Sequence, residues 1–118
     1  MIKLRSSSAV LLGALVFCLT SKCLAQSNSD ASSSSTVTLI ESYNNYGNGD
    51  VYFKIANPTA ACQDGYWLTK TDLGFSTNMA ILLSAYQAKS TVRIVGFSDQ
   101  RWSGSAGKFC KLNFITLS

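Results

Sequence analysis

The sequence predicts a small β-rich α+β domain, in which five strands form a curled sheet or barrel and one α-helix lies between the third and fourth strands. Five short segments are rich in β-branched and aromatic residues and are bounded by turn-forming residues. Only one segment has the apolar spacing of a helix. The folded part is expected to span the 83 residues from 36 to 118. A single core of this size often needs a covalent link or oligomerisation.

Residues 1–25 are typical of a secretory signal peptide. Two basic residues precede the apolar run 9–20, and the tripeptide CLA fits cleavage after Ala25. The run of 12 residues is shorter than the roughly 20 that a membrane-spanning helix needs. Lipidation of Cys23 is an alternative, although a lysine precedes this cysteine where a small residue is wanted. We therefore expect a secreted or periplasmic protein without a membrane span after cleavage.

Residues 26–35 (QSNSDASSSS) are expected to form a flexible leader, because the segment has no apolar residue larger than alanine. The remainder, 36–118, is interpreted as one domain. Without the signal peptide, the chain keeps seven basic and six acidic residues, a net charge of +1. The basic residues are scattered rather than clustered, so we expect no nucleic-acid partner.

The strands follow from alternation and composition. Residues 51–56 alternate apolar and outward-facing side chains, and 36–43 are rich in β-branched residues. An Asn- and Gly-rich turn joins these two segments, which predicts a hairpin. The remaining strands are expected at 66–71, 91–97 and 109–117.

The helix is predicted over 76–88, with Ser76 or Thr77 as its N-cap. Its apolar residues recur at i, i+3, i+4 and i+7 and form one stripe. Burial against the sheet explains the stripe, and partial cover by a neighbouring subunit is the alternative, which makes it a candidate oligomer interface. The stripe consists of Met79, Leu82, Leu83 and Tyr86.

Cys62 and Cys110 are the two cysteines outside the signal peptide, and we expect them to form a disulfide in an oxidising compartment. The closed loop would contribute about 4 kcal/mol to stability. The alternative is a pair of buried thiols.

The composition disfavours catalysis. The chain contains no histidine, which excludes Ser-His-Asp and Cys-His arrangements and any zinc site with a histidine ligand. No phosphate-binding glycine motif occurs. We therefore expect a protein that is not an enzyme and has no metal and no cofactor. The acidic residues of the predicted domain are interpreted as solvated turn residues rather than a glycosidase pair. These acidic residues are Glu41, Asp50, Asp64, Asp72 and Asp99.

Aromatic residues beside predicted loops are the candidate ligand contacts, since an aromatic ring offers apolar area to a sugar ring. For Tyr66 and for Trp67, each taken alone, packing in the core or on a sheet face is the favoured explanation. Trp102 is either an exposed contact or folded back over an open end of the sheet. The candidate ligand-binding residues are Tyr46, Tyr66, Trp67, Arg101 and Trp102.

A set of residues between 51 and 110 carries a resemblance to a known family. The set comprises Tyr52-Phe53-Lys54-Ile55, Ala61-Cys62, Trp67, Phe75-Ser76, Leu82-Leu83, Ala85, Ser90-Thr91-Val92-Arg93-Ile94 and Cys110. In these residues the chain resembles the B subunits of AB5 toxins of the subtilase-cytotoxin and typhoid-toxin type. It also resembles small exported bacterial proteins of unassigned function.

The resemblance implies an OB-like barrel that assembles as a pentamer, binds a cell-surface glycan and has an A-type toxin subunit as partner. Gln87-Ala88-Lys89 departs from the family's aromatic helix end, and no glycan-contacting residue is carried over onto residues 34–36. We therefore expect a non-enzymatic, exported, glycan-binding module that acts as an oligomer. The alternatives are a monomeric periplasmic or cell-surface structural protein and a small secreted enzyme inhibitor with the loop around Trp102 as its wedge.

Overall fold

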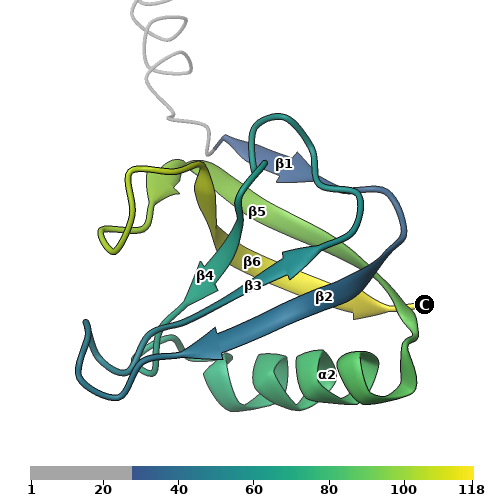
Figure 1. The fold of residues 1–118 in the computed structure, drawn as a ribbon, viewed down its shortest axis with the longest axis horizontal. Coiled ribbons are helices and arrows are strands. Elements are labelled where there is room, and N and C mark those ends of the chain that lie inside the picture. Colours follow the sequence, from purple (N-terminus) through teal and green to yellow (C-terminus); the bar gives the residue numbers. More distant parts are fainter. Residues whose placement is uncertain (1–27) are drawn as a thin grey trace, which may run out of the picture.

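The computed structural model describes residues 28–118, and the predicted signal peptide lies outside the described residues (Figure 1). One helix lies between the fourth and fifth strands, so the β-rich α+β class and the place of the helix are confirmed. This described part of the chain has no helix with the length and apolarity needed to cross a membrane. The elements are β1 (Ser29–Ala31), β2 (Ser35–Ser42), β3 (Val51–Ile55), β4 (Gly65–Leu68), α2 (Phe75–Ala88), β5 (Thr91–Arg101) and β6 (Phe109–Leu117).

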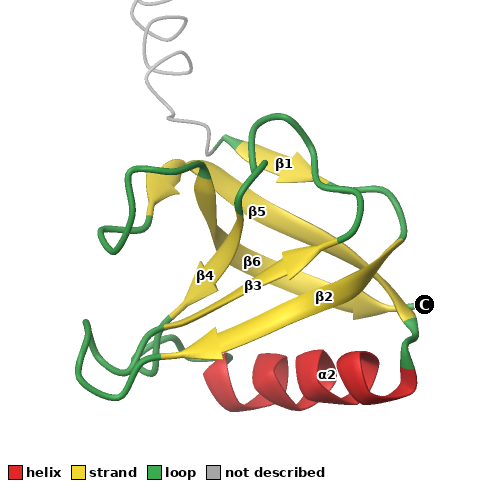
Figure 2. Cartoon of the chain, in the orientation of Figure 1, coloured by secondary structure: helices red, strands yellow, loops and turns green. Residues whose placement is uncertain are grey.

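All six strands belong to one sheet, in the order β1-β5-β2-β3-β4-β6, and β6 also pairs with β5 (Figure 2). The strand pairings therefore form a closed series, because β5 pairs with β2, β2 with β3, β3 with β4, β4 with β6, and β6 with β5 again. β4 and β6 pair in parallel, whereas the other pairs are antiparallel. α2 contacts both β2 and β6, and it lies along β2 in Figure 1.

The expectation of a flexible leader at 26–35 is wrong for the part that the structure describes. β1 pairs antiparallel with residues 95–97 of β5, and β2 already begins at Ser35. The sheet therefore has six strands rather than five, and its ordered part begins before residue 36.

Serine hydroxyls explain why this polar segment is ordered. The Ser32 hydroxyl oxygen accepts the backbone N–H of Ile94 at 3.0 Å, and the Ser35 hydroxyl oxygen accepts the N–H of Asn57 at 2.8 Å. Both serines are buried. A buried backbone group needs a hydrogen-bond partner. A short side chain with a hydroxyl therefore stabilises this segment without contributing apolar area.

The predicted bounds of two strands and the predicted cap of the helix change. β4 ends at Leu68 rather than at residue 71, because the Asp72 carboxylate accepts the Thr69 N–H at 2.9 Å and closes a turn. β5 continues beyond residue 97 to Arg101. α2 begins at Phe75 after Gly74, and no side chain caps it, so the cap predicted at Ser76 or Thr77 is wrong.

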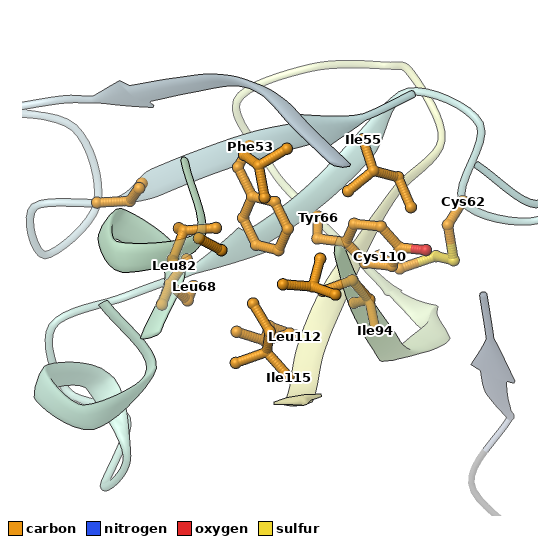
Figure 3. Packing of buried hydrophobic residues seen from close by; sticks show 14 residues of the cluster. Phe53, Ile55, Cys62, Tyr66, Leu68, Leu82, Ile94, Cys110, Leu112 and Ile115 are labelled. Carbon is orange, nitrogen blue, oxygen red and sulfur yellow. A yellow bond between two sulfur atoms is a disulfide. The ribbon is translucent and has the colours of Figure 1, made fainter. Parts of the chain in front are cut away.

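The main core lies between the strands and α2, and the inward residues of the alternating strands fill it (Figure 3). Val51, Phe53 and Ile55 of β3 point inward as their alternation predicts. Phe53 stacks on Tyr66 of β4 with ring centroids 5.4 Å apart. Leu82 of α2 closes the core from the side of the helix.

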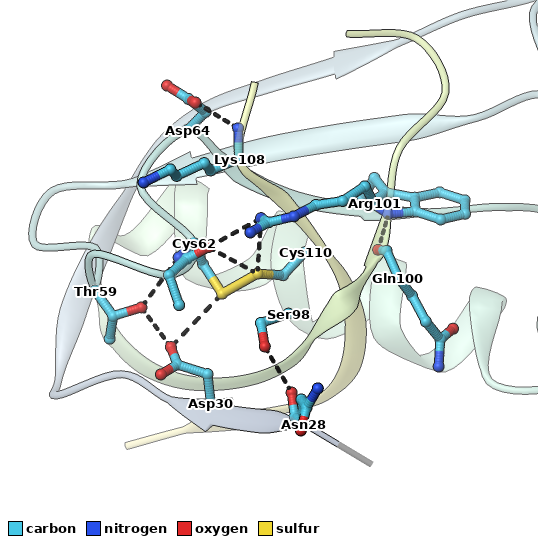
Figure 4. The surroundings of a disulfide bond; sticks show 12 residues. Asn28, Asp30, Thr59, Cys62, Asp64, Ser98, Gln100, Arg101, Lys108 and Cys110 are labelled. Atoms are coloured by element: carbon cyan, nitrogen blue, oxygen red, sulfur yellow. Dashed lines mark hydrogen bonds between the residues drawn. A yellow bond between two sulfur atoms is a disulfide. The ribbon is translucent and has the colours of Figure 1, made fainter. Parts of the chain in front are cut away.

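The predicted disulfide between Cys62 and Cys110 is confirmed, and both cysteines are fully buried. The bond joins the turn before β4 to β6 over 48 positions, which corresponds to about 4 kcal/mol of stabilisation. β1 lies beside it, because the Asp30 Oδ2 atom is 3.6 Å from the Cys62 sulfur and accepts a hydrogen bond from Thr59 (Figure 4).

Candidate functional site

Two loops meet at one end of the sheet through a buried polar contact. The turn between β2 and β3 contains Asp50, and the loop between β5 and β6 begins at Trp102. The Trp102 Nε1–H donates to the Asp50 Oδ2 atom at 2.9 Å, and both side chains are about 4% exposed. The other Asp50 oxygen accepts the N–H of Asn48 at 3.3 Å. Asp50 therefore fixes the conformation of its own turn and holds the second loop against it.

Glycines allow the close approach of these two loops. A Cβ at Gly104 would overlap the Trp102 indole, and a Cβ at Gly47 would overlap the Asp50 carboxylate. Gly47 also has a φ of 61°, a conformation that glycine adopts without a steric penalty. Trp102 is thus folded back rather than exposed.

Four aromatic rings surround Trp102, with ring centroids between 5.3 and 5.8 Å from its own. We call these five residues the aromatic cluster. Its members come from β3, β6 and the two loops. Such ring pairs contribute roughly 0.5–1.5 kcal/mol each beyond their buried area. The cluster lies outside the main core and consists of Tyr43, Tyr46, Tyr52, Trp102 and Phe109.

The exposed part of the aromatic cluster consists of two tyrosine rings. Tyr43 is 37% exposed and Tyr46 is 38% exposed. The Tyr46 hydroxyl donates to the Ser103 hydroxyl oxygen at 2.9 Å, which links the turn to the loop a second time. The two rings contact each other edge to face at 6.3 Å. They form a small aromatic surface, which we call the tyrosine surface, and exposed asparagines of the same turn border it.

Glu41 controls the protonation of the neighbouring tyrosines. Its carboxylate, as a hydrogen-bond acceptor, and then burial raise the pKa of Tyr52 to about 12. Burial first and the charge of Glu41 second raise the pKa of Tyr43. Both phenols therefore lose their protons only above the usual pKa range of a tyrosine, and the Tyr43 hydroxyl donates to the Glu41 carboxylate at 3.4 Å.

The other predicted ligand contacts lie elsewhere. Trp67 is half-buried, donates its Nε1–H to the Gln100 carbonyl at 3.0 Å, and carries the Lys111 ammonium 4.3 Å from its ring centroid. Tyr66 is fully buried in the main core, so its assignment as a ligand contact is wrong. Burial raises the pKa of Tyr66 to about 12, and the charge of Asp30 adds to the shift.

Arg101 is next to the disulfide rather than at the tyrosine surface (Figure 4). Its Nη1 atom donates to the Ala61 carbonyl at 2.9 Å and lies 3.8 Å from the Cys110 sulfur. Of the five predicted residues, only Tyr46 and Trp102 come together. Trp102 supports the surface from beneath, so it offers neither an exposed ligand contact nor a wedge for a target enzyme.

Sequence reasoning missed the role of Asp50, which was interpreted as a solvated turn residue. Asp64 and Asp72 also have structural partners. The Asp64 carboxylate accepts the N–H of Lys108, and Asp72 forms an ion pair of 2.9 Å with Lys111. The only signal for Asp50 was its place at the end of a turn, next to an inward-facing strand residue.

The predicted helix stripe does not stay together. Leu82 is fully buried in the main core, so its assignment to an oligomer interface is wrong. Met79 is half-buried, whereas Leu83 is 47% and Tyr86 42% exposed. Of the four stripe residues, Leu83 and Tyr86 are therefore the two that offer a neighbouring molecule a substantial apolar area.

The tyrosine surface presents two half-exposed aromatic rings to solvent. Within residues 28–118, no group of three or more His, Cys, Asp or Glu side chains is placed to hold a metal ion. Comparison with known proteins gave no match to any family model, curated protein or solved structure. The function must therefore be argued from the geometry of the chain itself.

Proposed function

We propose that this protein is a non-enzymatic, exported binding module, secreted or periplasmic, and that the tyrosine surface binds carbohydrate. The observation that carries the proposal is the pair of half-exposed tyrosines, Tyr43 and Tyr46, on the β2–β3 turn, which the contact between Asp50 and Trp102 holds against the β5–β6 loop. Aromatic rings offer apolar area to the face of a sugar ring, and phenol hydroxyls offer hydrogen bonds to its hydroxyl groups. The disulfide supports the proposed compartment.

We further infer that β2 to β6 form an OB-like five-stranded barrel. The closed series of pairings, the parallel pair β4–β6 and the helix between β4 and β5 support this inference. OB folds bind oligosaccharides and oligonucleotides on the face of their second and third strands and on the loops between strands 1 and 2 and strands 4 and 5. In this chain those two loops are the β2–β3 turn, which carries the tyrosine surface, and the β5–β6 loop, whose Ser103 and Trp102 contact that turn.

The charges near the tyrosine surface favour a sugar over a nucleic acid. Glu41 is exposed beside Tyr43, and the Tyr43 hydroxyl oxygen lies 3.4 Å from the Glu41 Oε1 atom. A negative charge at this position repels phosphate, whereas single-stranded nucleic acids are bound in positively charged grooves. Sugar hydroxyl groups can donate hydrogen bonds to the same carboxylate.

Binding to an array of glycans tests the proposal directly. We expect the exported protein to bind a subset of glycans and the Y43A/Y46A double variant to lose at least tenfold in affinity for them. Phe114→Ala is the matched control, because Phe114 is 49% exposed but lies on β6. Absence of binding by the native protein, or equal loss in the control, would contradict the proposal.

We also propose that the module acts as an oligomer, a pentamer with an A-type subunit if the resemblance to toxin B subunits extends to assembly. The exposed Leu83 supports an interface on α2. Light scattering after size-exclusion chromatography should give a mass of about five chains. Leu83→Glu should reduce that mass, and Ser84→Glu, on a polar face of the same helix, should not. A monomeric native protein would favour the alternative of a monomeric structural protein of the periplasm or cell surface.

A further inference from the structure

A groove separates the C-terminal end of α2 from the beginning of β2. Its volume is about 300 Å³, and it is lined by Thr36, Val37, Thr38, Tyr86 and Lys89. This volume is at the lower end of the range for small-molecule sites, roughly 300–1,000 Å³, and suits one ring rather than a chain of several. β2 runs from this groove towards the β2–β3 turn, so the groove and the tyrosine surface lie at opposite ends of the strand (Figure 1).

Two backbone irregularities face this groove from opposite sides. The register of β2 against β3 shifts between Val37 and Leu39, which leaves Thr38 without a partner in β3. Such bulges re-aim a side chain and are frequent next to binding sites. Across the groove, Lys89 has a φ of 54° and is the single non-glycine residue with positive φ among residues 28–118.

The lysine at this position is informative because glycine would fit the backbone better. Helices commonly end with glycine in the left-handed conformation, where a side chain adds a steric cost. The Lys89 side chain lines the groove, and no carboxylate of the described part of the chain lies within 4.0 Å of its ammonium, since the one ion pair recorded there joins Lys111 and Asp72. Its charge is therefore available to a ligand.

The walls of the groove define the chemistry of that ligand. The Tyr86 ring is 42% exposed and offers a platform for another ring, with Val37 as a second apolar wall. The hydroxyls of Thr36 and Thr38 can donate or accept hydrogen bonds. The C-terminal end of a helix repels anions, so the Lys89 ammonium is the group that would attract one.

We propose that this groove binds a small ligand that carries a carboxylate on a single ring, with the ring against Tyr86 and the carboxylate paired with Lys89. The proposal is independent of carbohydrate binding at the tyrosine surface. Sugar acids and aromatic acids share the required chemistry. The threonine hydroxyls favour the first, and the apolar walls favour the second.

NMR titration of the ¹⁵N-labelled exported protein distinguishes these ligands. The probes are glucuronate and benzoate, with glucose and benzyl alcohol as their neutral counterparts at the same ionic strength. We expect saturable shifts at residues 36–38 and 86–89, and at least fivefold tighter binding of one acid than of its neutral counterpart. The acid that binds more tightly identifies the ring. Absence of saturable shifts with both acids, or equal binding of acid and neutral counterpart, would overturn the proposal.

Two substitutions of Lys89 separate a ligand role from a structural one. Both Lys89→Gly and Lys89→Gln should abolish the preference for the acid, while Lys54→Gln, at an exposed lysine of β3, should retain it. Lys89→Gly should unfold at a higher temperature than Lys89→Gln, because only glycine relieves the left-handed strain. Retained preference for the acid in both Lys89 variants would refute the proposal. The Y43A/Y46A variant should bind the acid normally, so this test does not depend on the glycan proposal.

Discussion

The main core and the aromatic cluster differ in where their residues come from and in the interactions that hold them together. The main core takes its residues from inward positions of alternating strands, and Phe53, Leu68 and Leu82 are fully buried there around a disulfide. The aromatic cluster takes Tyr52 from an outward position of the same strand β3 and covers it with Trp102 from a loop. The core is closed by apolar contact and a covalent bond, whereas the cluster depends on one buried hydrogen bond to a carboxylate.

We propose that the two regions have different roles: the main core provides stability, and the aromatic cluster presents the residues that contact a ligand. Phe53, Leu68 and Leu82 of the main core are closed off from ligand contact, while the cluster buries Trp102 and leaves the rings of Tyr43 and Tyr46 half-exposed. Loops that are already ordered before binding lose less entropy when a ligand arrives. The hydrogen bond between Asp50 and Trp102 therefore holds the two loops together, as the disulfide holds the turn before β4 to β6.

The largest expected effect is on the main core. Replacing both Cys62 and Cys110 with alanine should lower the free energy of unfolding by about 4 kcal/mol, because the unfolded chain loses the constraint of the closed loop. Urea unfolding followed by circular dichroism measures the loss. Added reductant should destabilise the native protein but not the double variant. A loss below about 1 kcal/mol would show that the strands do not need their covalent link.

An intermediate effect is expected in the cluster. Asp50→Ala leaves the buried Trp102 N–H without a partner and should cost about 2 kcal/mol, whereas Asp50→Asn keeps an acceptor and should cost less. Acrylamide quenching of tryptophan fluorescence should increase in the alanine variant as Trp102 becomes accessible. Trp67→Phe as a background removes the second tryptophan from the signal. Unchanged quenching would mean that packing alone holds the loop.

The smallest effect at neutral pH is expected for Tyr66→Phe. The Tyr66 hydroxyl is buried and has no hydrogen-bond partner among the described residues, so its removal should change stability at pH 7 by less than about 1 kcal/mol.

At alkaline pH, the Tyr66 hydroxyl should have a larger effect on the stability of the protein. Burial raises the pKa of Tyr66 from 10.0 to about 12, so the folded protein keeps a proton that the unfolded chain releases. The contribution of Tyr66 to stability is complete below pH 10 and is lost as the pH rises towards 12, by about 1.4 kcal/mol per pH unit. The native protein should therefore lose stability relative to Tyr66→Phe in this window. Parallel curves would contradict the burial of a neutral phenol.

Alternation and composition predicted most of the fold. The period-two pattern at 51–56 and the helical spacing at 76–88 reflect burial on one face, and burial is what these patterns encode. The ordered segment from β1 to the beginning of β2 escaped prediction because Ser32 and Ser35 contribute hydrogen bonds rather than apolar area. The disulfide was predictable because two cysteines remained to pair.

The candidate site was less predictable, for a physical reason. Tyr46 and Trp102 were recognised as aromatic residues near loops, but their contact joins segments more than 50 positions apart. Asp50 is buried only because Trp102 folds over it, and no local pattern encodes that event. For Tyr66, packing was already the favoured explanation of the residue taken alone, and its full burial agrees with it.

The central claim is that the carbohydrate binds on the two half-exposed tyrosines, Tyr43 and Tyr46. NMR titration of the ¹⁵N-labelled exported protein with the glycan that binds most tightly on the array tests it most directly. We predict the largest shift changes at Tyr43, Tyr46 and Ser103, with little change at residues 79–86. Changes confined to the helix, with none at the two tyrosines, would contradict this account.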